Sequence, residues 1–187
     1  MLIRAAKKED APAIADFIAM AESEMVHHFT GSTDPEKSRE ALQEFILNPT
    51  LNRYSLENNL VAEVDGQAAG SMISFPADKQ PDLDHVLLDA LNKRGYGLDK
   101  LFFEGVPGTY YLSTMGVNPQ FRGRGIGSAL MAGSEKEAAR QGFSRLSLLV
   151  SKGKPKVQAL YERLGYKAVE DVQIADVLYR RMAKDIA

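Results

Sequence analysis

The hydrophobic and polar positions of the chain follow two periods, one typical of amphipathic helices and one typical of short strands. Between residues 9 and 26, Ile14 and Ile18 lie on one face at helical spacing, which predicts a first helix there. A second helix is expected at 34–46, because Asp34 can cap its first turn and a proline follows at once.

Strand patterns occupy most of the remaining chain and are rich in β-branched, aromatic and aliphatic residues. The expected strands lie at residues 1–6, in a hairpin at 59–75 that turns at Asp65 and Gly66, at 109–117, at 144–150, and as a pair between 167 and 186.

Two further helices are expected at 125–143, where Gly142 supplies a left-handed cap, and at 155–166. The pattern weakens between 76 and 108, so we expect an excursion there that contains one helix. No linker or repeat interrupts the chain. The order of elements predicts a single domain over residues 1–187, of the α/β class, with a mixed sheet flanked by helices.

Composition narrows the possible functions. The 187 residues include no cysteine, which excludes disulfides, thiolate metal sites and a cysteine nucleophile. The net charge of −2 gives no electrostatic reason to expect a nucleic-acid or membrane partner. The chain shows neither a signal peptide nor an apolar run long enough to cross a bilayer. We therefore expect a cytoplasmic protein without a metal.

The segment NPQFRGRGIGSAL, residues 118–130, combines two arginines with three glycines between a predicted strand and a predicted helix. The first amides of a helix have no partner within the helix and favour an anion. The glycines let a phosphate approach the backbone, and Arg122 and Arg124 can pair with its oxygens. The loop is therefore predicted to bind phosphate.

Two well-known phosphate loops do not fit this segment. A P-loop needs a Gly-Lys pair followed by serine or threonine, and the sequence has no such motif. A dinucleotide loop follows its strand directly with the spacing G-x-G-x-x-G, whereas here Asn118–Phe121 intervene and the spacing is G-x-G-x-G. No acidic residue ends the next strand either.

The pattern R-x-x-G-x-G, as Arg122–Gly127, resembles the pyrophosphate loop of the GNAT superfamily of N-acetyltransferases. The surrounding MGVNPQFRGRGIGSALM and the later ALYERLGY are similar to that family's loop and closing helix, and the order of elements agrees over nearly the whole chain. The resemblance implies a mostly antiparallel sheet, whose fourth and fifth strands splay apart, and acetyl-coenzyme A as cosubstrate.

In this family the cleft between those strands holds the pantetheine arm, and a backbone amide of the fourth strand stabilises the oxyanion. Met115 and Val117 are the candidates for that amide here, and Gly116 is compatible with a strand bulge, a close approach or a packing contact. The residues that the resemblance implies for binding the coenzyme are Met115, Gly116, Val117, Arg122, Gly123, Arg124, Gly125, Ile126, Gly127, Ser128 and Lys154.

Tyr161 matches a tyrosine that many family members place near the coenzyme sulfur, where it protonates the leaving thiolate. A second interpretation is available from the sequence. With Val157, Leu160 and Leu164, Tyr161 forms an i, i+3, i+4, i+7 stripe, so its ring could simply pack against the core.

The sequence departs from the family pattern at two places. Lys154 stands where many members carry an asparagine that bonds the pantetheine arm, and a lysine can donate but not accept. Lys152, Lys154 and Lys156 could instead reach a phosphate or form a solvated turn. The fourth strand also lacks the glutamate that serves some members as general base. The candidates for that base are Glu104, Glu24, His27 or a water relay.

We therefore expect an N-acetyltransferase that moves an acetyl group to a primary amine of a small molecule or a protein, by direct attack in a ternary complex. Glu22, Glu24 and Glu104 could attract a cationic amine. The alternative is a non-catalytic acyl-coenzyme A-binding or regulatory module on the same fold. Family members are often dimers, so a homodimer stays open.

Overall fold

The chain folds around one seven-stranded sheet with the strand order β1-β2-β3-β4-β5-β7-β6. The computed structural model describes residues 1–22, 26–174 and 176–186. Within these residues, β4 and β5 form the one parallel pair, and every other neighbouring pair is antiparallel. The mixed, mostly antiparallel sheet expected from the sequence is therefore confirmed.

The bounds of the elements agree with the hydrophobic pattern over most of the chain. The strands are β1 (Leu2–Ala5), β2 (Asn59–Val64), β3 (Gln67–Pro76), β4 (Tyr110–Val117), β5 (Arg145–Ser151), β6 (Lys167–Ile174) and β7 (Val177–Asp185). The helices are α1 (Ala11–Ala21), α2 (Val26–Thr30), α3 (Pro35–Ile46), α4 (Gln80–Leu83), α5 (His85–Lys93), α6 (Ile126–Arg140) and α7 (Pro155–Arg163).

Local chemistry explains several of these boundaries. The Asp34 carboxylate accepts hydrogen bonds from the backbone N–H groups of Glu36 and Lys37 and so caps α3. Asp65 and Gly66 both have positive φ, 51° and 77°, as a tight turn between β2 and β3 requires. These features were expected from the sequence and are confirmed.

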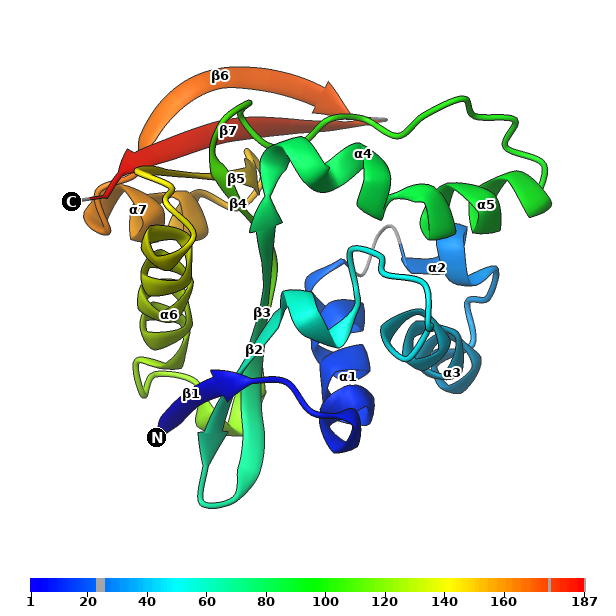
Figure 1. The fold of residues 1–187 in the computed structure, drawn as a ribbon, viewed down its shortest axis with the longest axis horizontal. Coiled ribbons are helices and arrows are strands. Elements are labelled where there is room, and N and C mark those ends of the chain that lie inside the picture. The colour runs from blue at the N-terminus through cyan, green and yellow to red at the C-terminus, as the bar shows by residue number, and fades with distance from the viewer. Residues whose placement is uncertain (23–25, 175, 187) are drawn as a thin grey trace.

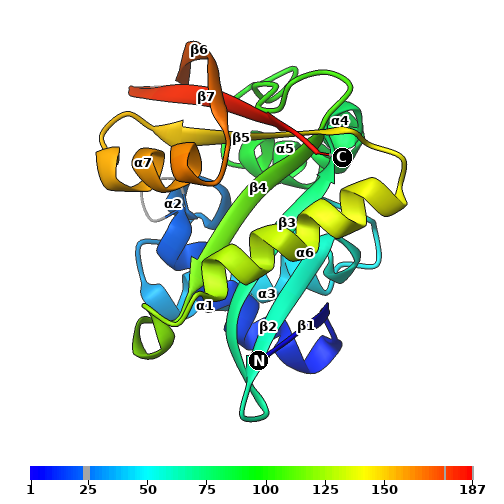
Figure 2. The same cartoon turned by 90° about the vertical axis from the view of Figure 1, so that its left-hand side faces the viewer.

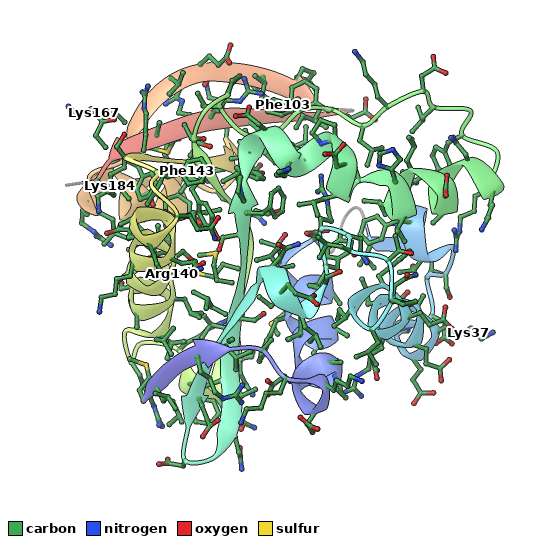
Figure 3. All side chains as sticks on the ribbon, viewed as in Figure 1. Lys37, Phe103, Arg140, Phe143, Lys167 and Lys184 are labelled. Carbon is green, nitrogen blue, oxygen red and sulfur yellow. The ribbon has the colours of Figure 1, made fainter. Side chains whose placement is uncertain are left out.

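Two hydrophobic cores lie on opposite faces of the sheet. Figure 1 shows α6 and α7 on one side and α1, α2, α3 and α5 on the other. Figure 2, turned by 90°, shows α6 running across the sheet in front of β3 and β4. Figure 3 shows how side chains fill the space between these layers. Strand β4 contributes to both cores, with Tyr110 on the α6 side and Tyr111 on the α1 side.

The excursion at residues 76–108 differs from its expected form. It holds two consecutive helices, α4 and α5, where a single helix was expected. The first helix is also shorter than the one predicted over residues 9–26. Helix α1 ends at Ala21, and a separate helix, α2, is assigned from Val26. Hydrophobic periodicity alone does not mark where a continuous apolar pattern breaks into separate helices.

Strand β4 is irregular at Ser113, and this irregularity opens the sheet. The β3–β4 register shifts by one residue between the pairs Ile73–Thr114 and Ser74–Leu112, which makes Ser113 an extra residue in β4. The parallel ladder between β4 and β5 covers Tyr110–Leu112 and stops at that point. The splayed cleft implied by the family resemblance is thus present, with the bulge at its origin.

The glycine at position 116 is not part of the bulge, and its role is a packing contact. A Cβ atom added there would lie 2.5 Å from the Cβ of Phe17 and 2.6 Å from its backbone oxygen. The absence of a side chain therefore lets α1 pack directly on β4. Of the meanings that the sequence left open for this glycine, the close packing contact is the one observed, and the strand bulge lies three residues earlier.

We predict that Gly116→Ala destabilises the fold by about 1–3 kcal/mol, because the new methyl group must push the α1 backbone away from the sheet. Urea unfolding of the variant and the parent would measure the difference. Gly153→Ala is a suitable control, since its Cβ would meet only the Ser151 hydroxyl, at 3.4 Å. Equal stability of the Gly116 variant and the parent would show that α1 is not held this closely.

Candidate functional site

The arginine–glycine loop connects β4 to the first turn of α6 and is exposed to solvent. Gly123 and Gly125 have φ values of 76° and 77°, a left-handed conformation that side chains with a Cβ rarely adopt. Gly125 is the N-cap residue of α6, and it provides no side-chain cap. The glycines of the loop therefore have two functions. They allow the left-handed backbone conformation, and they leave the backbone amides accessible to a ligand.

The start of α6 leaves donors available for an anion. Ala129 donates a backbone hydrogen bond to the Gly125 carbonyl and so closes the first turn of the helix, which the amides of Ile126, Gly127 and Ser128 precede. The side chain of Ile126 is buried in the core, which restricts any ligand contact to its backbone, whereas Ser128 is exposed.

The two arginines of the loop remain exposed. Arg124 lies over the Phe121 ring, with its guanidinium carbon 5.3 Å from the ring centroid. Arg122 contacts the sulfur of Met20 at 3.6 Å. Within the described part of the chain neither arginine forms an ion pair. Their charges are thus available to a phosphate group, which fits the predicted ligand.

A narrow cavity lies where β4 and β5 separate. Its lining comes from β3, β4, β5, α6 and α7 and consists of Met72, Leu112, Ser113, Thr114, Met115, Met131, Leu148, Leu149 and Tyr161. The cavity therefore brings the bulged residue of β4 and the predicted acid together. Met115 and Val117 lie on the part of β4 that has lost β5 as a ladder partner.

Tyr161 reaches this cavity from α7. Its ring packs against Tyr166 edge-to-face, with centroids 5.9 Å apart. Burial raises the pKa of the Tyr161 phenol above its ordinary value, so the group stays protonated at neutral pH. The ring therefore packs against the core, as one of the two interpretations predicts, and the residue also lines the cavity. Its catalytic role stays a prediction.

Glu104 belongs to a buried ionic network beneath the excursion. Its Oε1 accepts a hydrogen bond from Arg53 Nη1 at 2.8 Å, and its Oε2 accepts one from the Tyr111 hydroxyl at 2.7 Å. Arg53 also makes a forked pair with Asp84, at 2.6 and 2.9 Å. Gln80 completes the network by accepting from the Glu104 backbone N–H. These contacts anchor residues 76–108 to the core.

Glu22 lies beside this network, at the end of α1. Its Oε2 accepts a hydrogen bond from the Tyr54 hydroxyl at 2.8 Å, and its Oε1 accepts one from the Thr114 hydroxyl of β4. The sequence suggested Glu22 only as an attractor of cations and did not place it against β4. No local pattern could do so, because 92 positions separate Glu22 from Thr114.

The other predicted residues are not part of the cavity lining or fall outside the described residues. Glu24 falls among residues 23–25, which are not described. His27 is exposed on α2, with its ring 3.9 Å from that of His28. Lys154 is the exposed N-cap residue of α7, and Lys152 is paired with Asp171 at 2.6 Å. The predicted coenzyme contact of Lys154 stays a prediction.

Residues 1–22, 26–174 and 176–186 contain no group of three histidine, aspartate or glutamate side chains that could hold a metal ion. Over the same residues, none of the helices has the length and apolar character needed to cross a membrane.

Comparison with known proteins agrees with this geometry. The sequence model of the acetyltransferase (GNAT) family matches residues 21–166. A curated acetyltransferase of Pectobacterium atrosepticum is 30% identical over 115 residues, which cover 62% of this chain and 61% of that relative. The match thus spans less than two thirds of the relative's own length.

Solved structures extend the similarity to the whole chain. A crystal structure of an acetyltransferase is 33% identical, covers 100% of both chains and superposes with a TM-score of 0.81. The crystal structure of an N-acetyltransferase from Staphylococcus aureus Mu50 has a TM-score of 0.84 over 98% of this chain and 100% of that one. At 20% identity this second likeness shows the fold alone. With a family model that matches most of its length, this chain belongs to the GNAT family of acetyltransferases.

Proposed function

We propose that this protein transfers the acetyl group of acetyl-coenzyme A to a primary amine by direct attack within a ternary complex. Family membership supports acetyl transfer from this cosubstrate. The observation that carries the finer proposal is the cavity at the splayed strands. The bulge of β4 and Tyr161 both line it, and the loop that follows β4 leads to the first amides of α6 and carries two exposed arginines.

In this proposal, different residues bind the coenzyme and assist the chemical step. The loop Arg122–Gly127 and the first turn of α6 bind the phosphates through charge and backbone N–H groups. The unpaired part of β4 positions the acyl arm along the cavity. The amine nitrogen forms a bond to the thioester carbon, the carbon–sulfur bond breaks, and Tyr161 donates its phenolic proton to the departing thiolate. The chain has no cysteine to carry the acetyl group.

The phosphate part of this proposal predicts saturable binding of acetyl-coenzyme A in titration calorimetry, without comparable binding of ATP or NAD. Arg122→Ala should weaken that binding about tenfold or more, because a charge-assisted hydrogen bond to phosphate is lost. Lys37→Ala is the control, since this exposed lysine lies on α3, across the molecule from α6 (Figure 3). A parent protein that does not bind the coenzyme would contradict the proposed function.

The acid role of Tyr161 predicts that Tyr161→Phe slows turnover about a hundredfold or more while the affinity for acetyl-coenzyme A stays the same. Release of free thiol and calorimetry would measure the two quantities. Tyr166→Phe is the matched control, because the Tyr166 hydroxyl is buried without a hydrogen-bond partner among the described residues. Unchanged turnover in the Tyr161 variant would reduce this residue to a packing role. A parent protein that binds acetyl-coenzyme A but turns over no acceptor would favour the alternative of a binding module.

A further inference from the structure

The carboxylate of Glu22 is linked to the cavity through one side chain. Thr114 lines the cavity together with Tyr161, and its hydroxyl donates a hydrogen bond to Glu22. Because Thr114 directly follows the bulged Ser113, this contact lies where β4 leaves β5. Glu22 is therefore adjacent to the region in which the acceptor amine must meet the acyl arm.

Glu22 and its carboxylate neighbours differ in their ionic partners. Arg53 forms ion pairs with Asp84 and Glu104. Glu22, by contrast, receives hydrogen bonds from two neutral hydroxyls, those of Tyr54 and Thr114. Among the residues that the structure describes, Glu22 thus forms no ion pair. A carboxylate without an ion pair, one side chain from the cavity, can attract a cationic group such as the ammonium form of an amine.

The two candidate carboxylates differ in what the uptake of a proton would cost. Arg53 can only donate, so the Glu104 oxygen that faces it must act as an acceptor. The hydroxyls facing Glu22 can donate to a carboxylate or accept from a carboxylic acid, because each rotates to suit. The surroundings of Glu22 therefore satisfy both of its protonation states without the loss of an ion pair, whereas protonation of Glu104 would cost its pairing with Arg53.

The electrostatics of the site agree with this difference. Burial raises the pKa of the Glu22 carboxyl, and the negative charge of Glu104 acts in the same direction. The hydroxyls of Thr114 and Tyr54 and the positive charge of Arg53 oppose the shift, but the result remains upward. A carboxyl shifted toward neutral pH is a more effective proton acceptor than an ordinary glutamate.

We propose that Glu22 is the general base, which accepts the proton that the acceptor ammonium must lose before its nitrogen can attack. This inference rests on the proposed amine acetylation. The ammonium nitrogen gives its proton to a Glu22 oxygen and keeps the electron pair, which then forms the bond to the thioester carbon. Thr114 and Tyr54 position the carboxylate, and Tyr161 supplies the separate proton that the thiolate takes up.

The pH dependence of the rate tests this assignment. The probes are 2-phenylethylamine, spermidine and a short peptide with a free amino-terminal alanine, each with acetyl-coenzyme A. For the parent, kcat/KM should decrease as the pH is lowered through the range in which Glu22 becomes protonated. This decrease is the acidic limb of the pH profile. Glu22→Gln should lower kcat/KM about 10²- to 10⁴-fold and remove this acidic limb, while acetyl-coenzyme A binds with unchanged affinity. Glu22→Asp should restore part of the rate.

Two comparison variants test whether the effect is specific to Glu22. Glu44→Gln removes an exposed carboxylate of α3 and should leave the profile unchanged. Glu104→Gln should lower the stability but keep the acidic limb, because its partner Arg53 is left with one carboxylate. Loss of the limb in the Glu104 variant, with its retention in Glu22→Gln, would overturn the proposal in favour of Glu104.

A titration of the side-chain carboxyl by carbon-detected NMR needs no acceptor. The Glu22 signal should titrate above the ordinary range of glutamate. A Glu22 carboxyl that titrates at the ordinary value would overturn the proposal even if no probe amine reacts. Failure of the proposed function gives a different result, namely a parent protein that does not bind acetyl-coenzyme A in calorimetry.

Discussion

The end of the parallel ladder between β4 and β5 is the constraint on which the rest of the site depends. Three residues of each strand pair, and the bulge at Ser113 then redirects β4. A continuous sheet would use the backbone groups of β4 for hydrogen bonds to β5 and would leave no space between the strands. Because the pairing stops, the same strand can hold a β-ladder with β3 on one edge and line a cavity on the other.

This arrangement is stable because β4 belongs to both hydrophobic cores. Its side chains alternate between the α6 face and the α1 face, so the strand is fixed from two sides although part of one edge has no ladder partner. Gly116 adds a direct backbone contact with Phe17 of α1. The helix that carries Glu22 and the strand that carries Thr114 are thereby held together, and the hydrogen bond between these two residues follows from the packing.

Local sequence signals were sufficient for the parts of the protein that local chemistry determines. The Asp34 cap, the Asp65–Gly66 turn and the glycines of the arginine–glycine loop could be predicted because each depends on residues a few positions apart. The split of the excursion into α4 and α5 and the contact between Glu22 and Thr114 could not. They depend on tertiary neighbours, such as Arg53, whose partners Asp84 and Glu104 are 31 and 51 positions away.

The ionic network also explains why the missing strand carboxylate does not by itself argue against catalysis. A glutamate on β4 would need its own charge compensation within a strand that already forms two cores. Here the carboxylates come from α1 and from the segment before β4, and they meet β4 through the hydroxyls of Thr114 and Tyr111. The strand thus supplies neutral side chains that bond in either protonation state, while the charge sits on elements that can be anchored by Arg53. In such a site the position of the proposed base is set by the packing of α1 on β4, and the strand itself can line the cleft.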